Sequence, residues 1–378
     1  MQNFDDIRFY KDEEVNDALR EYVKHPMVKA LLQFTFPEMK SSDIQAILGE
    51  CHSIADFQSK VIYLSVEKVL EKTSEGLSDN GFEELDSKES YFYISNHRDI
   101  ILDTSLINYT LHDHDLIMTA SAIGDNLVQK PFLMALSKLN RNFLVQRNQS
   151  PREMLKSSMK LSEYIKHLLF NEDRSVWMAQ REGRTKDGND FTQQGVLKMV
   201  GMAKGDMDIL DYFTNLKIVP VAMSYEFDPT DMLKMPEVLA KRMKEEYKKS
   251  ANEDFNSIMQ GAMGQKGRIQ ISAGKMLTKE DFDPIREKEL SINDQLKEVS
   301  TLIDNAIYRN YKLWPANYIA YDLLKNENRF EDKYTEKEKR QFDRRISRRV
   351  DVKNPLALNS YLLMYANPVI NKMSLNEE

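Results

Sequence analysis

The sequence is poor in the residues that build small, cross-linked or extended proteins. It has one cysteine, Cys51, in 378 residues, which excludes an internal disulfide framework and a cysteine-rich zinc module. Glycine and proline are scarce, with 13 and 11 residues, so a collagen-like or linker-rich chain is excluded as well. The remaining composition, 41% hydrophobic and 30% charged, indicates an ordinary globular chain with much helix.

Positive charge and long apolar runs are also missing. The formal net charge is −7, and we expect no nucleic-acid partner because such partners require a cationic surface that displaces counterions from phosphates. The first fourteen residues are acidic and lack the apolar stretch of a secretory signal. No window reaches the roughly 18 apolar residues of a spanning helix. We therefore expect a cytoplasmic protein that does not span a membrane.

Hydrophobic periodicity divides the chain into three regions. Residues 1–80 have apolar positions at helical spacing and no cluster of chemically active residues, which predicts a helical N-terminal region. Residues 81–290 alternate short β-rich runs with helical stretches, a pattern typical of a mostly parallel sheet covered by helices. Residues 291–378 return to a helical pattern. The expected fold class is α/β, with helical regions at both ends.

The predicted strands indicate where a site should lie, because sites in parallel α/β sheets gather at the carboxyl ends of strands. Strands are predicted at Tyr91–Ser95, Leu116–Ser121, Phe143–Gln146, Val176–Ala179, Ile218–Tyr225 and Arg268–Ser272. Helices are predicted between them at Ile101–Leu111, Val128–Leu139 and Met154–Phe170. The polar residues that follow the strands are therefore the first candidates for function.

The first predicted strand is followed by a histidine, His97, and two carboxylates, Asp99 and Asp103. An imidazole titrates near neutral pH, so it can take a hydroxyl proton and later return it. A carboxylate on its other nitrogen fixes the tautomer and stabilises the imidazolium. Positions 97 and 103 do not face each other on a regular helix, so their pairing requires a strand-to-helix turn. Either aspartate can instead cap the helix; we predict Asp103 as the partner, with Asp99 as the alternative.

Three further strands carry candidate residues. Arg147 follows a strand, and its guanidinium suits a phosphate or carboxylate, although a surface ion pair is an equally good explanation. Glu182, Gly183 and Arg184 lie in a loop rich in cations and glycine, which indicates an anion site, although a solvated polar turn explains the loop by itself equally well. Pro220 lies within a strand, where we expect it to shape the site because it cannot donate to the ladder.

Taken in order, these blocks resemble the motifs of the glycerolipid acyltransferases, the superfamily of glycerol-3-phosphate and lysophosphatidate acyltransferases. The matching blocks are His97 to Asp103, Phe143 to Arg147, Glu182 to Thr185, and Ile218 to Val221. The glycerol-3-phosphate branch is the closer likeness, because His97-Arg98 resembles its His-Arg start. Two spacings depart from the family pattern: five residues rather than four separate the histidine from the aspartate, and the Glu-Gly-Arg block is one residue short.

The resemblance implies transfer of a fatty acyl group from an acyl thioester, acyl-CoA or acyl-carrier protein, to a hydroxyl of glycerol 3-phosphate or a lysophospholipid. His97, held by Asp103, acts as general base, and no metal or cofactor takes part. The implied substrate-binding residues are Arg98, Asp99, Arg147, Glu182, Gly183, Arg184 and Pro220. Two stretches with an excess of cations, 234–249 and 333–349, are candidates for peripheral contact with the inner face of a membrane, although a solvated charged helix is the default explanation for either.

Two other interpretations remain open from the sequence. The run His112-Asp113-His114-Asp115 contains donors for a divalent ion, which indicates a metal-dependent hydrolase. The irregular motif spacings favour a non-catalytic scaffold that keeps the acyltransferase fold. Cys51 falls in an amphipathic helical pattern without a matching third group, so we expect a buried thiol rather than a nucleophile.

Overall fold

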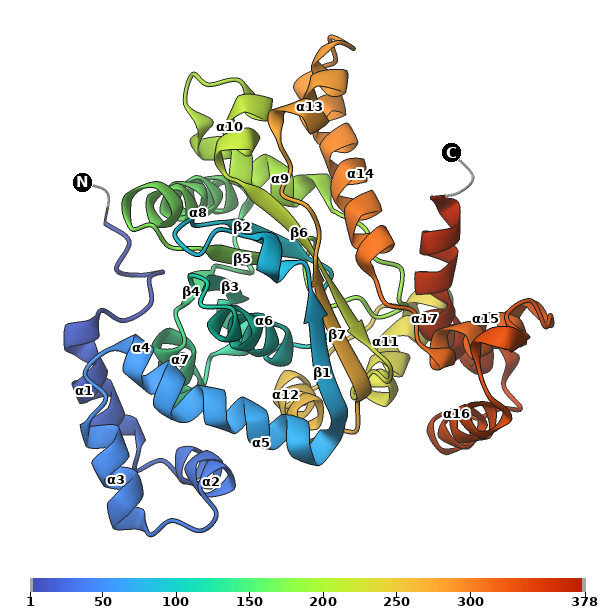
Figure 1. Ribbon diagram of the computed structural model, residues 1–378, viewed down its shortest axis with the longest axis horizontal. Coiled ribbons are helices and arrows are strands. Elements are labelled where there is room, and N and C mark those ends of the chain that lie inside the picture. Colours follow the sequence, from blue (N-terminus) through green and yellow to red (C-terminus); the bar gives the residue numbers. More distant parts are fainter. Residues whose placement is uncertain (1–2, 376–378) are drawn as a thin grey trace.

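A seven-stranded sheet forms the centre of the computed structural model, which describes residues 3–375 (Figure 1). The strands are Ser74–Asn80 (β1), Phe92–Ser95 (β2), Ala120–Gly124 (β3), Asn142–Val145 (β4), Val176–Ala179 (β5), Ile218–Tyr225 (β6) and Gly267–Ala273 (β7). Their order is β1-β7-β6-β2-β5-β3-β4. β6, β2, β5, β3 and β4 are mutually parallel, whereas β7 runs antiparallel to β6 and parallel to β1. The expected mostly parallel α/β fold is confirmed.

The predicted strands differ in how well they match. Those at Val176–Ala179 and Ile218–Tyr225 coincide with β5 and β6. The strand that was expected to start at Leu116 starts at Ala120 instead. Leu116 lies in the segment that precedes β3, and its side chain is nevertheless buried, which is why it looked like part of the strand. β1 was expected to be helical. Its side chains are polar and mostly exposed, so an edge strand held by main-chain pairing with β7 leaves no apolar pattern in the sequence.

The helices before the sheet are Asp12–Tyr22 (α1), Pro26–Thr35 (α2), Ser41–Gly49 (α3), Ile54–Phe57 (α4) and Tyr63–Thr73 (α5). They enclose an apolar cluster that includes Val15, Leu32 and Phe57. Cys51 belongs to this cluster and is fully buried, as expected of a structural thiol. It lies just after α3 rather than within a helix. Residues 1, 2 and 376–378, the outer ends of the predicted terminal regions, lie outside the described residues.

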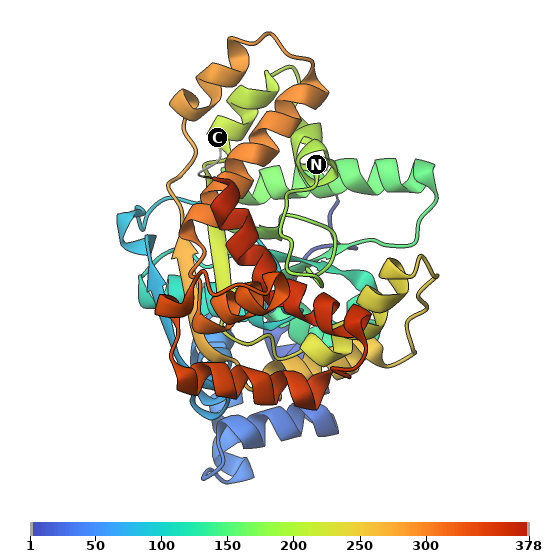
Figure 2. The same cartoon turned by 90° about the vertical axis from the view of Figure 1, so that its right-hand side faces the viewer.

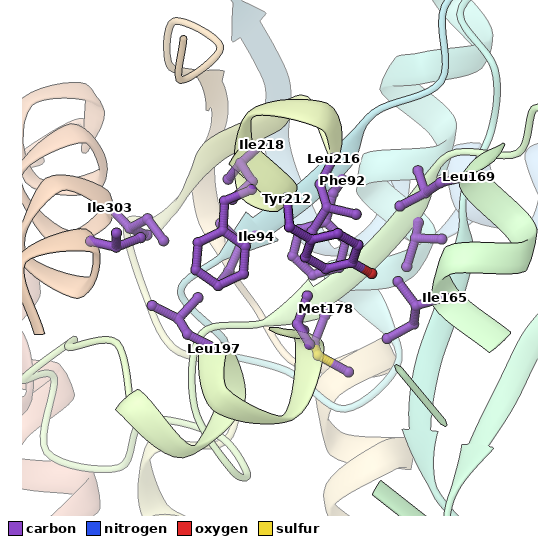
Figure 3. Packing of buried hydrophobic residues seen from close by; sticks show 14 of the residues in the cluster. Phe92, Ile94, Ile165, Leu169, Met178, Leu197, Tyr212, Leu216, Ile218 and Ile303 are labelled. Carbon is purple, nitrogen blue, oxygen red and sulfur yellow. The ribbon is translucent and has the colours of Figure 1, made fainter. Parts of the chain in front are cut away.

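Helices cover both faces of the sheet. They are Leu102–Asp113 (α6), Pro131–Leu139 (α7), Pro151–Asn171 (α8), Gln194–Val200 (α9), Ile209–Asn215 (α10), Asp231–Arg242 (α11), Glu253–Met263 (α12), Lys279–Arg286 (α13) and Ile292–Asn310 (α14). Phe92 of β2 belongs to the apolar cluster that also contains Ile165 of α8, Leu197 of α9 and Ile303 of α14 (Figure 3). The next residue, Tyr93, faces the opposite side and packs in the cluster that contains α6. This alternation is the period of a strand buried on both faces.

The last helices are Pro315–Lys325 (α15), Glu336–Arg349 (α16) and Pro355–Ser374 (α17). They share an apolar cluster with α11, through Met235 and Leu239, and lie together at one side of the sheet (Figure 2). Within residues 3–375, no helix combines the length and apolar character that crossing a bilayer requires.

The two basic stretches do not form two free surface helices as expected. α11 ends at Arg242, so the second half of 234–249 is largely non-helical, and Lys234 is buried inside the protein with 1% exposed. α16 does cover most of 333–349, but Arg345 and Arg349 form ion pairs with buried Asp231. Only part of the positive charge in either stretch is therefore available to a partner.

Asp304 of α14 links that helix to the segment before α9. Its carboxyl oxygen accepts hydrogen bonds from the backbone N–H and the hydroxyl of Thr192, at 2.7 and 2.6 Å. Burial nevertheless raises the pKa of Asp304 to about 7, because removal from water disfavours the carboxylate more than these two bonds favour it.

We predict that Asp304→Asn raises the free energy of unfolding near neutral pH. A carboxyl with a raised pKa contributes fully to stability below the pKa of the unfolded chain, and that contribution is lost as the pH rises through the folded pKa. The amide keeps an acceptor for Thr192 without the charge. We expect a gain of about 1–3 kcal/mol at pH 7 and almost none at pH 4, measured by chemical denaturation. Equal effects at the two pH values would contradict this explanation.

Candidate active site

A cleft of about 1020 Å³ opens at the carboxyl ends of the parallel strands. Residues at four neighbouring strand ends line it: His97 after β2, Gly124 on β3, Arg147 after β4 and Glu182 after β5. Part of the wall is apolar and includes Ile123, Leu127, Leu144, Val145, Leu161, Met178 and Met199. The cleft therefore lies where the topology predicts a site, with polar groups next to an apolar surface.

The side chain of His97 meets Asp103 at the edge of this cleft. Nδ1 of His97 lies 2.8 Å from Oδ2 of Asp103. Asp103 is the second residue of α6, so the chain makes the strand-to-helix turn that the pairing requires. The imidazole keeps 12% of its surface exposed, whereas the carboxylate has none. One nitrogen is thus held from inside the protein while the ring borders the cleft.

Asp103 accepts several hydrogen bonds besides the one at the imidazole. The backbone N–H groups of Arg98 and Asp99 donate to its Oδ2, at 2.6 and 3.0 Å, and the Tyr225 hydroxyl donates to its Oδ1 at 2.9 Å. Burial and the neighbouring Asp103 charge raise the pKa of Tyr225 well above its usual value, so this phenol remains a donor. These bonds fix the orientation of the carboxylate against the ring.

Asp99 has the other role considered for these two aspartates. Its Oδ1 accepts from the backbone N–H groups of Ile101 and Leu102, at 3.0 and 2.9 Å, and so satisfies donors at the start of α6. Within the described part of the chain, its Oδ2 has no hydrogen-bond partner. Burial and the nearby Asp103 raise the pKa of Asp99. Asp103 is therefore the partner of His97, and Asp99 is the cap.

Neighbouring elements fix the loop that carries His97. The Asn96 side chain donates to the backbone oxygen of Met223 at 3.0 Å and accepts from its N–H at 2.7 Å. The backbone N–H of Thr185 donates to the carbonyl oxygen of His97 at 2.8 Å. The histidine loop, residues 96–101, is thus held by β6 on one side and by the loop after β5 on the other.

Arg147, Glu182, Gly183 and Arg184 all line the cleft. Nη1 of Arg147 lies 2.6 Å from Oε1 of Glu182, in a pair whose side chains are 31% and 68% exposed. An exposed pair of this kind contributes little, so an incoming anion can replace the carboxylate. Gly183 has φ of +69°, which favours glycine, and the space where a side chain would project is open. Arg184 reaches the hydroxyl of Thr230 at 3.5 Å.

Arg98 does not face the cleft, contrary to the expectation that it binds substrate. Its guanidinium is buried, pairs with Asp190 and lies 5.5 Å from the centre of the Tyr311 ring. Asp99 is likewise enclosed, with 1% of its surface exposed. Arg98 pairs with Asp190, and Asp99 binds the start of α6, so both side chains stabilise the histidine loop from within the protein.

Pro220 is also not among the described residues that line the cleft. It is buried in β6, opposite Ile94 of β2. Its carbonyl oxygen accepts a hydrogen bond from the N–H of Gly274, which follows the last residue of β7. The nitrogen and the carbonyl of a strand residue face the same neighbouring strand. The nitrogen of Pro220 therefore faces β7 at a point beyond the last paired residue of that strand. A proline is tolerated at this position in a central strand because no ladder donor is needed there.

The cleft carries more positive than negative side chains. Its lysines and arginines are Arg147, Lys160, Arg181, Arg184, Lys186, Lys241, Arg242 and Lys249, and its acidic residues are Glu182, Asp187, Glu237 and Asp254. Lys186 pairs with Glu237 of α11. Burial, together with Lys249 and Arg184, lowers the pKa of Lys186 to about 7. This distribution of charge suits an anionic ligand.

Sequence reasoning missed the supports of the site. Tyr225 is the last residue of a correctly predicted strand, and that position was a usable signal. Asp190 and Lys234 could not be recognised from the sequence. A charged residue that is buried by pairing with a distant residue cannot be distinguished in the sequence from a charged residue on the surface.

The His112 to Asp115 run does not assemble into a ligand set. Nε2 of His114 lies 2.7 Å from Asp79, and the Tyr63 hydroxyl donates to Asp113 at 2.6 Å. Across the residues that the structure describes, no three histidine, cysteine, aspartate or glutamate side chains are grouped so that they could hold a metal ion. The geometry therefore gives no support to the metal-dependent hydrolase.

Comparison with known proteins agrees with the motifs. The family model described as Acyltransferase matches residues 77–224, a segment that contains His97, Arg147 and Arg184. The segment is therefore similar to acyltransferases, which supports the resemblance that the motifs indicate.

Among solved structures, the chain is similar to the crystal structure of PlsC, the 1-acyl-sn-glycerophosphate (LPA) acyltransferase from Thermotoga maritima. The identity is 10%, the alignment covers 77% of this chain and 92% of that one, and the TM-score is 0.37. No curated protein matches the sequence.

Proposed function

We propose that this protein transfers a fatty acyl group from an acyl thioester to a hydroxyl of glycerol 3-phosphate or a lysophospholipid. The observation that carries the proposal is the 2.8 Å contact between His97 and Asp103 beside a cation-rich cleft. When Nδ1 donates to the carboxylate, Nε2 remains as the base that takes the proton of the acceptor hydroxyl.

The reaction follows from this arrangement. As Nε2 of His97 takes the hydroxyl proton, the alcohol oxygen attacks the thioester carbonyl carbon and a tetrahedral oxyanion forms. The intermediate collapses, the carbon–sulfur bond breaks, and the sulfur leaves as a thiol with the proton held by the imidazolium. Asp103 stabilises that imidazolium. The backbone near Gly183, where space is open, is our candidate for stabilising the oxyanion.

Arg147 and Arg184 are the proposed ligands of the acceptor phosphate. A guanidinium can give two parallel hydrogen bonds to a phosphate, and both side chains border the same cleft as His97. Glu182 pairs with Arg147 in this structure. In the proposed complex the phosphate displaces this carboxylate, which then accepts hydrogen bonds from the glycerol hydroxyls. The apolar wall offers a surface for the acyl chain. Acyl-CoA and acyl-carrier protein present the same thioester, so either can serve as donor.

Membrane contact is proposed for the side on which the cleft is bordered by α8 and the segment after α11. Met154 and Leu155, in the first turn of α8, are 55% and 63% exposed. Lys244 and Lys248 are exposed on the segment that follows α11. Figure 2 shows the start of α8 and this segment on the same side of the molecule. Apolar side chains beside cations are suited to an anionic lipid surface, from which a lysolipid reaches the cleft.

The first prediction from the proposed function concerns the base. We expect the wild-type protein to transfer a labelled acyl group from a thioester to at least one acceptor in a panel of glycerol phosphates and lysophospholipids. His97→Ala should lower kcat at least ~100-fold, since the general base is lost. His112→Ala, which changes an exposed histidine outside the cleft, should leave kcat unchanged. An inactive wild-type protein would favour the non-catalytic scaffold, and full activity of His97→Ala would contradict the assigned base.

The second prediction concerns the phosphate site. Arg184→Met and Arg147→Met should each raise the acceptor KM about 10-fold or more, because each removes charged hydrogen bonds to the phosphate. The donor KM should not change. Arg20→Met, at an exposed position of α1, is the control. Steady-state kinetics with the best acceptor measure the effect, and unchanged kinetic constants for both arginine variants would refute the assignment.

The third prediction concerns the lipid surface. Lys244→Glu/Lys248→Glu should reduce sedimentation with vesicles that contain anionic phospholipid, and added salt should reduce the binding of the wild-type protein. Lys29→Glu/Lys40→Glu, on exposed positions of the N-terminal helical region, makes the same charge change elsewhere. Equal losses in the two variants would mean that net charge, and not this surface, determines binding.

A further inference from the structure

Lys234 is a buried cation that the proposed reaction does not use. It lies in the first turn of α11 with 1% of its surface exposed. Its Nζ donates to the backbone carbonyl oxygen of Arg98 at 2.9 Å and pairs with the carboxylate of Asp228. A buried ammonium is costly unless it is paired and hydrogen-bonded, so both contacts are needed for Lys234 to occupy this position.

The carbonyl that Lys234 holds is next to the candidate base. Arg98 directly follows His97, and its own N–H donates to Oδ2 of Asp103. The two peptide units that follow His97, one on each side of Arg98, are thus anchored: Thr185 binds the His97 carbonyl, and Lys234 binds the Arg98 carbonyl. A shift of the Arg98 residue would move the imidazole and the donor to Asp103 together.

The C-terminal helices in turn hold the partner of Lys234. The Asp228 backbone N–H donates to the hydroxyl of Tyr365 in α17 at 3.2 Å, and Arg345 of α16 donates to the Asp228 carbonyl oxygen at 2.8 Å. Three residues on, Asp231 accepts from the Tyr365 hydroxyl at 2.8 Å and pairs with Arg345. Residues 226–234 therefore join α16 and α17 to the histidine loop.

This support lies outside the acyltransferase match, which ends at residue 224. We propose that Lys234 is a positioning residue for His97, and that α16 and α17 act on the site through Asp228 and Asp231. The inference rests on the proposed acyl transfer for its kinetic consequence, but the placement of His97 can be measured without it. The C-terminal helices are then part of the catalytic unit rather than an appended region.

The kinetic test uses Lys234→Met/Asp228→Asn, which removes both charges and leaves neither one buried alone. We expect kcat to fall about 10-fold or more, because small displacements of a reacting group are costly, while the acceptor KM stays within about twofold. Lys266→Met is the matched control. Lys266 is equally buried, but it donates to Thr73 and to the carbonyls of Ala262 and Gly264, outside the histidine loop. Its loss should lower stability without changing the kcat of the folded protein.

A second pair of variants tests the C-terminal helices with a smaller change, since each removes only one hydroxyl. Tyr365→Phe should lower kcat severalfold at unchanged KM. Tyr212→Phe is the control, because the buried Tyr212 hydroxyl has no hydrogen-bond partner in the described part of the chain. If Lys234→Met/Asp228→Asn does not fold, this pair carries the test.

The placement of His97 is read independently from the proton NMR signal of its Nδ1–H in the bond to Asp103, assigned by its absence in His97→Gln. We expect the signal in the wild-type protein and in Lys266→Met, and its broadening or loss in Lys234→Met/Asp228→Asn and Tyr365→Phe. Unchanged kcat and an unchanged signal in the Lys234 and Tyr365 variants would overturn the inference. If the wild-type protein transfers no acyl group, the proposed function fails, and the NMR signal alone decides whether Lys234 positions His97.

Discussion

One buried carboxylate organises the centre of this protein. Asp103 has no exposed surface, yet it accepts from the imidazole of His97, from two backbone N–H groups of the turn and from the Tyr225 hydroxyl. A carboxylate removed from water is tolerated only when such donors surround it. The strand-to-helix turn, the orientation of the imidazole and its link to β6 therefore depend on a single set of hydrogen bonds.

Two kinds of interaction position the residues of the site. Apolar packing on both faces of the sheet sets the strand order and brings four strand ends to the cleft. Buried polar contacts then fix the loops: Arg98 pairs with Asp190, and Lys234 pairs with Asp228. Such pairs add little net stability because desolvation offsets attraction, but breaking one is costly. In this chain they select one loop conformation, and the C-terminal helices contribute to that selection.

Much of the fold could be predicted because apolar periodicity is a local property. β5 and β6 were located to the residue, whereas β1 was taken for helix since its side chains are mostly polar and exposed and give no alternating apolar pattern. In the site, His97 and Arg147 were found because each directly follows an apolar strand. Arg98 and Pro220 were expected to bind substrate, but neither is among the described residues that line the cleft, since a position in a motif does not say which way a side chain points.

The sequence by itself determined an α/β sheet with helices, the ends of its main strands and the group of residues at those ends. Strand alternation and helical periodicity can be recognised because they depend only on residues that are close together in the sequence. Only the tertiary structure decided that Asp103 and not Asp99 meets the imidazole, and that Arg98 and Lys234 point inward. The physical reason is that a charge can be buried only beside a partner. The partner of Arg98 is Asp190, 92 residues away along the chain, and local periodicity does not show which distant residues will pair.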